Sequence, residues 1–178
     1  MSTQLEKALN GILTEEMVQA AKFDGVSPEF ILNGLANGSI TLCKNINHKF
    51  FPRAVGKGLS TKVNANIGTS QLICSLENEL EKARVAQDAG ADSIMDLSTA
   101  GKLDLIRTKI IENSNVMIGT VPIYSLAADY SLNGKSIYEN FEKDDLFNEF
   151  EKQAKQGVDF FTVHCGITLS TLSTINNT

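Results

Sequence analysis

Short apolar runs alternate with longer stretches of helical periodicity from residue 61 onward. Four apolar runs bounded by turn-forming residues predict strands, at 61–67, 91–98, 115–124 and 158–166. Three stretches with apolar residues three and four positions apart predict helices, at 75–90, 101–114 and 145–157. Strands separated by helices pair in parallel, so this pattern predicts an α/β fold with a parallel sheet.

An internal repeat supports this assignment. The segments AQDAGADSIMDL (86–97) and AKQGVDFFTVH (154–164) both run from alanine through polar residues to glycine, a small apolar residue and aspartate. In both, the aspartate leads directly into a predicted strand. The similarity therefore indicates a repeated βα unit.

The first 60 residues have a different pattern. Thr14 before two glutamates, and Ser27 before Pro28, are helix start signals. They predict two short helices within about the first forty residues. Segment 39–60 has one short apolar run, and we expect an irregular connector or a small ribbon there.

Charge and composition exclude several classes of protein. The 178 residues carry a net charge of −5 without any run of Lys and Arg, so the footprint of a nucleic-acid binder is missing. Apolar runs are far shorter than the roughly 18–20 residues that cross a bilayer, and the first residues are too polar for a signal peptide. We therefore expect a cytoplasmic protein with neither a nucleic-acid nor a membrane partner.

The cysteines form no motif of their own. Cys43, Cys74 and Cys165 are too few and too scattered for a disulfide framework or a C-x-x-C metal site. Cys165 stands beside a histidine, but the ordered base and orienting carboxylate of a thiol nucleophile are missing. We expect reduced thiols, with Cys165 small and buried.

Parallel βα folds have their sites at the carboxyl ends of the strands. The residues predicted there are Asn64, Asn66, Met95, Asp96, Ser98, Pro122, Tyr124, His164 and Cys165. Asn64 and Asn66 are two positions apart, so an extended chain places both side chains on one face. Asparagine is depleted from strands, which favours a site, but strands also end in polar residues wherever loops begin. Position alone therefore leaves both readings open.

Four segments that contain these residues have the order and the spacing found in one known protein family. They are KVNANIGTS (62–70), SIMDLST (93–99), IGTVPIY (118–124) and GVDFFTVHCG (157–166). Together they resemble the phosphomethylpyrimidine synthase family of thiamine biosynthesis, and the head segments LEKALNGILTEEMVQAA, GVSPEFI and KNINH resemble it too. The similarity covers all but about the last ten residues. Four ordered motifs are far more specific than one short signature.

The resemblance implies a parallel (β/α)8 barrel of the TIM type and radical chemistry. Members of the family use a 4Fe-4S cluster, S-adenosylmethionine and a divalent metal, zinc, to rearrange 5-aminoimidazole ribonucleotide into 4-amino-5-hydroxymethyl-2-methylpyrimidine phosphate. Motif by motif, the resemblance implies four substrate-binding residues: Asn66, Met95, Tyr124 and His164. Amide, phenol and imidazole groups suit the ring nitrogens, amine, ribose and phosphate of this nucleotide, whereas Met95 is selected by the resemblance alone.

Family members continue beyond this sequence, through the second half of the barrel, a histidine metal site and a C-x2-C-x4-C cluster motif. The cysteines here cannot supply that cluster, and two histidines are too few for the metal site. We expect a helical segment and connector at 1–60, followed by the first half of the barrel at 61–178. The unpaired strand edges of a half barrel favour a homodimer or association with another chain. Alone, the chain is expected to be inactive.

Alternative functions and weaker candidates stay open at this stage. The related enzyme that makes 5-hydroxybenzimidazole from the same ribonucleotide, a non-catalytic half-barrel binding module and an unrelated phosphate-binding barrel are three alternatives. Asp96 is an acid, a base or the partner of a backbone amide. His48, with two neighbouring asparagines, either covers the rim that the carboxyl ends of the strands form, or holds a turn. Gly68 would let the backbone approach an oxygen-rich group closely.

Overall fold

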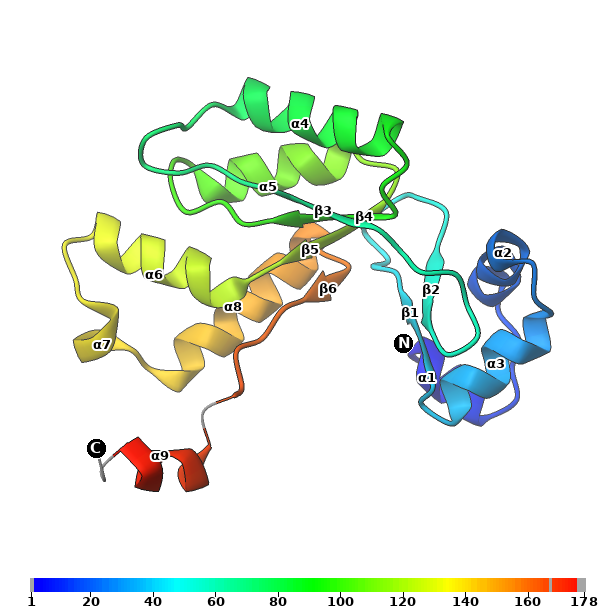
Figure 1. Ribbon diagram of the computed structural model, residues 1–178. Helices are drawn as coiled ribbons and strands as arrows, with labels where there is room; N and C mark the ends of the chain where they lie inside the picture. Colours follow the sequence, from blue (N-terminus) through cyan, green and yellow to red (C-terminus); the bar gives the residue numbers. More distant parts are fainter. Residues whose placement is uncertain (1, 167, 176–178) are drawn as a thin grey trace.

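The protein begins with short helices. Together with the two-stranded ribbon described below, they form the part that we call the head. The computed structural model describes residues 2–166 and 168–175 (Figure 1). Helices α1 (Gln4–Leu9), α2 (Glu15–Asp24) and α3 (Pro28–Ala36) each begin after a threonine or serine whose side chain accepts a backbone N–H. The sequence predicts α2 and α3 but not α1, because six residues carry too little periodicity. The signal for α1 is a capping box formed by Thr3 and Glu6.

A two-stranded ribbon follows the head helices. Strand β1 (Ile40–Cys43) pairs antiparallel with β2 (Arg53–Gly56), so a ribbon, one of the two predicted forms of this segment, is confirmed. Buried apolar residues of the ribbon and of α2 and α3 share one core. They include Met17, Ile31, Leu35, Ile40, Leu42 and Ala54. The ribbon is thus part of the head and not a free connector.

A four-stranded parallel sheet forms the rest of the fold. The strands β3 (Asn64–Ile67), β4 (Ser93–Asp96), β5 (Met117–Thr120) and β6 (Phe160–Phe161) lie in this order across it. The helices are α4 (Leu76–Asp88), α5 (Leu103–Glu112), α6 (Pro122–Leu132), α7 (Ile137–Asn140), α8 (Lys143–Gln156) and α9 (Leu169–Ile175). The α/β class, the four strands, their parallel pairing and helices α4, α5 and α8 are confirmed. In the part of the chain that the structure describes, no helix is long and apolar enough to cross a membrane.

Helix α6 overturns one boundary of the prediction. The apolar pattern extends the third strand to Tyr124, but the strand ends at Thr120 and Pro122 is the first residue of α6. Proline suits that position because its fixed φ is already helical and its missing N–H would be unpaired there anyway. Ile123 and Tyr124 favour a strand by propensity, yet they lie in the first helical turn.

The sheet has two different faces. Ile67, Ile94 and Ile118 pack with residues of α4 and α5 in a second core, and Figure 1 shows both helices on the same side of β3 and β4. Because side chains alternate along a strand, Asn66 and Met95 belong to the opposite face. We call the face that carries Asn64, Asn66, Ser93 and Met95 the open face. Its closure into a barrel stays a prediction, as does the division of the chain near residue 60.

The aspartates of the internal repeat align neighbouring strands. Asp92, directly before β4, donates its N–H to the Val63 carbonyl and accepts the Val63 N–H on its carboxylate, at 2.8 and 2.9 Å. Asp159, directly before β6, does the same with Ile118, at 2.8 Å in both bonds. The repeat in the sequence therefore reflects one strand-pairing device used twice.

Candidate functional site

One row of residues crosses the open face at the level of Asn66. Backbone pairing places Asn66 beside Met95, Met95 beside Gly119, and Gly119 beside Phe160. The Phe160 ring covers the glycine, because a Cβ at position 119 would lie 2.3 Å from its Cζ atom. Two of the four candidate residues, Asn66 and Met95, are therefore direct neighbours.

Asn64 lies one row earlier, at the beginning of β3 and not at its carboxyl end. Its predicted place at the rim is wrong, because the strand begins three residues later than the extended pattern suggests. Its amide contacts two side chains: Ser93 Oγ donates to Asn64 Oδ1 at 2.8 Å, and Asn64 Nδ2 donates to Asn66 Oδ1 at 2.9 Å. The prediction that Asn64 and Asn66 share one face is confirmed.

Tyr124 and His164 form a second pair. Tyr124 lies in the first turn of α6 and is 38% exposed, while His164 lies three residues beyond β6 and is exposed. Their ring centroids are 5.6 Å apart with an interplanar angle of 32°. The structure thus joins two residues that are 40 positions apart in the sequence, each with a polar group at an accessible surface.

Thr162 lies between the two pairs. Its Oγ1 is 4.0 Å from Sδ of Met95, and the chain reaches His164 two residues later. Thr162 and His164 also line a cavity of about 70 Å³ beside Pro122 and Phe150. Ligand pockets measure roughly 300–1,000 Å³, so a nucleotide would need the open face rather than this cavity. A wider hollow of about 810 Å³ lies in the head, and none of the four candidate residues lines it.

The loop after β3 is held by neighbouring protein groups. Gly68 donates its N–H to a carboxylate oxygen of Glu79 at 2.8 Å, and a Cβ at position 68 would lie 2.6 Å from the carbonyl carbon of Leu97. Thr69 donates its N–H to Ser98 Oγ at 3.1 Å. The structure therefore gives this glycine a different role from the predicted approach to an oxygen-rich ligand: it lets two backbone segments meet.

Asp96 ends β4 and is buried. Burial raises the pKa of its carboxyl group, and hydrogen bonds from Ser98 oppose that rise. Its Oδ1 accepts the Ser98 N–H at 2.9 Å. Of the roles left open by the sequence, partner of a backbone amide is the one that this geometry displays.

A buried polar network lies behind β5, and the sequence pattern does not predict it. Arg107 of α5 is 2% exposed, and its Nη2 donates to Ser125 Oγ at 2.8 Å and lies 3.7 Å from Glu149 Oε1. Gln153 of α8 donates to the same Glu149 oxygen at 2.6 Å and accepts a hydrogen bond from Thr120 Oγ1 at 2.5 Å. The network thus holds the junction between β5 and α6 from behind. Polar side chains four apart on α8 were the available signal, but a solvated helix face gives the same pattern.

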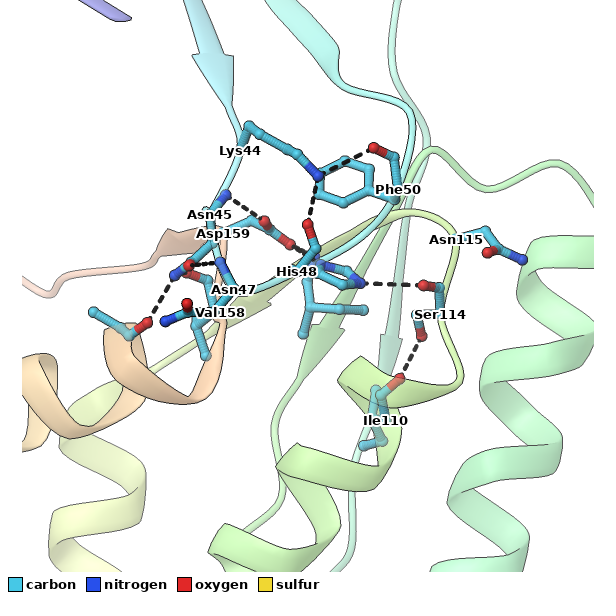
Figure 2. Close-up of polar contacts among 12 residues, drawn as sticks. Lys44, Asn45, Asn47, His48, Phe50, Ile110, Ser114, Asn115, Val158 and Asp159 are labelled. Atoms are coloured by element: carbon cyan, nitrogen blue, oxygen red, sulfur yellow. Dashed lines mark hydrogen bonds and ion pairs between the residues drawn. The ribbon is translucent and has the colours of Figure 1, made fainter. Parts of the chain in front are cut away.

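His48 fastens the ribbon to the amino ends of the strands. Figure 2 shows its ring between two oxygens: Nδ1 is 2.6 Å from Asp159 Oδ2, and Nε2 is 3.1 Å from the Ser114 carbonyl oxygen. Asn45 donates its backbone N–H to Asp159 Oδ1 at 2.8 Å. These contacts lie where the chain enters β5 and β6, opposite the carboxyl rim. His48 also donates its backbone N–H to the Asn45 carbonyl at 3.2 Å, so the predicted role of holding a turn is confirmed, and covering the rim is wrong.

Comparison with known proteins decides the family. Residues 3–178 match the family described as the radical SAM ThiC family. The chain belongs to this family. The resemblance inferred from the four motifs is therefore confirmed.

Within the radical SAM ThiC family, several relatives are about half identical to this chain. The phosphomethylpyrimidine synthase of Geobacter metallireducens is 52% identical over 177 residues, which are 99% of this chain and 41% of that protein. The phosphomethylpyrimidine synthase of Thermoanaerobacter sp. strain X514 is 49% identical over 176 residues, 98% of this chain and 40% of that protein. That of Pyrococcus furiosus is 49% identical over 167 residues, 93% of this chain and 39% of that protein. The chain thus spans about 40% of the length of these curated relatives.

A radical SAM ThiC protein implies an iron–sulfur cluster and S-adenosylmethionine, but the cysteines here do not fit a cluster. Cys43 lies on β1 in the head, Cys74 precedes α4, and Cys165 follows β6. Across residues 2–166 and 168–175, no three Cys, His, Asp or Glu side chains gather into a group that could hold a metal ion. Cys165 is exposed and not buried as predicted, because the chain has already left the sheet.

Proposed function

We propose that this chain is the substrate-binding part of a phosphomethylpyrimidine synthase. The proposed reaction rearranges 5-aminoimidazole ribonucleotide into 4-amino-5-hydroxymethyl-2-methylpyrimidine phosphate, the pyrimidine precursor of thiamine. The observation that carries the proposal is about 50% identity to phosphomethylpyrimidine synthases over nearly the whole chain. The grouping of Asn66 with Met95, and of Tyr124 with His164, supports a binding surface in this part of the fold.

In the proposed complex, each of the four residues has a role that its chemistry allows. The Asn66 amide hydrogen-bonds a polar atom of the nucleotide, and the Met95 thioether packs against the flat aminoimidazole ring. The Tyr124 hydroxyl and the His164 imidazole supply further hydrogen bonds from one side. These groups bind and orient the substrate.

A 4Fe-4S cluster with S-adenosylmethionine would supply the radical chemistry, and zinc is the further metal that the family implies. The described residues do not offer ligands that fit these groups, so the roles of this chain are binding and orientation. We propose that the ligands come from sequence or a partner chain outside the described residues. Strands β3 and β6 each pair with one neighbour among these residues, so either edge can accept a further strand. Completion of a barrel, by the same chain or in a homodimer, would also enclose the open face.

The test is equilibrium binding of 5-aminoimidazole ribonucleotide to the full-length gene product by calorimetry. We expect saturable binding that N66A and H164A each weaken by about tenfold or more, the size expected when a hydrogen bond to a charged or desolvated ligand group is lost. The control is N78D, because Asn78 is an exposed residue of α4 whose side chain lies outside the candidate site. No binding by the unsubstituted protein, or binding by N66A and H164A that is as tight as that of the unsubstituted protein, would contradict the proposal.

Product analysis separates the remaining alternatives. The protein is incubated with iron, sulfide, S-adenosylmethionine, a reductant and the ribonucleotide, and the products are identified by mass spectrometry. The pyrimidine phosphate is the expected product. 5-Hydroxybenzimidazole would identify the related cobamide enzyme, and binding without turnover would identify a non-catalytic module.

A further inference from the structure

We infer that Asn64 and Ser93 are positioning residues that hold the Asn66 amide with its N–H groups toward the substrate. This inference rests on the proposed function, and it goes further by stating which atoms of the nucleotide Asn66 can contact. It concerns three side chains of the open face that form one directed chain of hydrogen bonds.

The chain of hydrogen bonds begins at a buried hydroxyl. Ser93 is 4% exposed and is paired with Asn64 across the parallel strands β3 and β4. Its Oγ donates to Asn64 Oδ1 at 2.8 Å. A serine hydroxyl can donate or accept, and here the structure turns the oxygen side of the Asn64 amide toward Ser93.

The remaining side of Asn64 then determines the orientation of Asn66. With its oxygen engaged by Ser93, Asn64 directs its Nδ2 at Asn66 Oδ1, at 2.9 Å. Asn66 therefore uses its oxygen within the protein. Among the described residues, no protein group accepts a hydrogen bond from Asn66 Nδ2, and Asn66 is an exposed residue of the open face.

Asn66 thus turns its two N–H donors away from Asn64, while its oxygen is engaged by the Asn64 amide. It can bind the unprotonated ring nitrogen, a ribose oxygen or a phosphate oxygen of an aminoimidazole nucleotide. These N–H groups cannot bind the exocyclic amine, which is a donor whose lone pair is conjugated with the ring. The directed chain hence selects for an acceptor atom at this position of the ligand.

Two substitutions of Asn64 distinguish orientation from general disturbance. In N64A the Asn66 amide loses its partner and can rotate freely. In N64D the new carboxylate only accepts, so it would draw Asn66 Nδ2 toward itself and turn Asn66 Oδ1 toward the ligand. A positioning role therefore predicts that N64D harms binding more than N64A, although aspartate is closer to asparagine in size.

The experiment measures the Kd of 5-aminoimidazole ribonucleotide for the full-length gene product and these variants. We expect about a threefold weaker Kd for N64A and S93A, and at least about a tenfold weaker Kd for N64D. S93T keeps the hydroxyl and should restore binding to near the unsubstituted value. N78D adds the same charge on α4 and should bind normally. Urea unfolding of each variant identifies any loss of binding that comes from loss of folded protein.

The outcomes separate this inference from the proposed function. If the unsubstituted protein does not bind the ribonucleotide, the proposed function fails and this inference fails with it. If it binds and N66A weakens binding, but N64D binds as well as N64A, the proposed function stands and the inference is wrong. An Asn66 side-chain amide signal in NMR spectra that shifts with ligand in the unsubstituted protein, but not in N64D, would support it.

Discussion

The imidazole of His48 lies 2.6 Å from the carboxylate of Asp159, although the two residues are 111 positions apart. The same carboxylate, which is fully buried, accepts the backbone N–H of Asn45 and of Ile118, each at 2.8 Å. One side chain thus ties the ribbon to two neighbouring strands, as Figure 2 shows for the ribbon contacts. Because these contacts occupy the amino ends of the strands, the opposite end of the sheet is left to the segments that carry Tyr124 and His164.

Replacing Asp159 should destabilise the fold strongly. D159N keeps the shape, but its amide has one acceptor oxygen where the carboxylate has two, so buried donors lose their partner. We expect the free energy of unfolding to fall by about 3 kcal/mol, as measured by urea denaturation. The control is D88N, which removes an exposed carboxylate beside Arg84 and should barely change the urea midpoint. Equal midpoints for D159N and D88N would contradict this role.

Arg107 should matter for stability where Arg84 does not. Both arginines contact two carboxylates, but Arg107 is 2% exposed, whereas the Arg84 side chain is 60% exposed. We expect R107M to lower the free energy of unfolding by about 2–4 kcal/mol, because Glu149 would lose a nearby charge inside the protein. R84M should unfold at nearly the same urea concentration as the unsubstituted protein. The account of the network is wrong if the two variants behave alike.

Gly68 should tolerate a methyl group poorly. An added Cβ would lie 2.6 Å from the Leu97 carbonyl carbon, and φ is +151°. G68A should therefore cost about 2–3 kcal/mol in thermal or urea unfolding. Gly90 is the matched control, since its φ is +92° but nothing lies within 4 Å of an added Cβ. G90A should lose about 1 kcal/mol, and a larger loss there than in G68A would refute the proposed crowding.

The stability that Asp96 contributes should depend on pH. Burial raises the pKa of this carboxyl above its ordinary value of 3.8, so the folded protein holds the proton more tightly than the unfolded chain. The contribution is complete below the ordinary pKa and is lost as the pH rises through the raised one. We expect the free energy of unfolding of the unsubstituted protein, minus that of D96N, to be largest below about pH 4 and to fall toward pH 7. A difference that is constant or rises over this range would contradict the burial of an ionisable Asp96.

Local patterns predicted the sheet and three of its helices because periodicity and cap residues act within a few positions. The boundaries of the candidate site were less predictable. Tyr124 favours a strand by propensity, but Pro122 begins a helix before it. Asn64 lies at the opposite end of its strand from the predicted one. The alternation of side chains predicts the face of the sheet on which a residue lies, but not its position along the strand.

Long-range contacts account for the rest of what the sequence could not reveal. No spacing rule joins His48 to Asp159, or places Arg107 against Glu149 inside the protein. A charged side chain on a helix normally faces water, so burial of Arg107 had no local signal. Exposure of Cys165 likewise follows from where the chain leaves the sheet. The four candidate substrate residues came from the family resemblance, and their binding role stays a prediction.

The most direct test of the proposed binding site follows the methyl group of Met95 by NMR, in the full-length protein labelled with ¹³C at its methionine methyls. The NMR signal of Met95, assigned with M95L, is recorded while 5-aminoimidazole ribonucleotide is added. We expect this signal to shift saturably, because Met95 lies beside Asn66 on the open face, whereas the signal of Met17 in the core of the head stays in place. A Met95 signal that does not move at ligand concentrations that saturate the protein would contradict the proposed site.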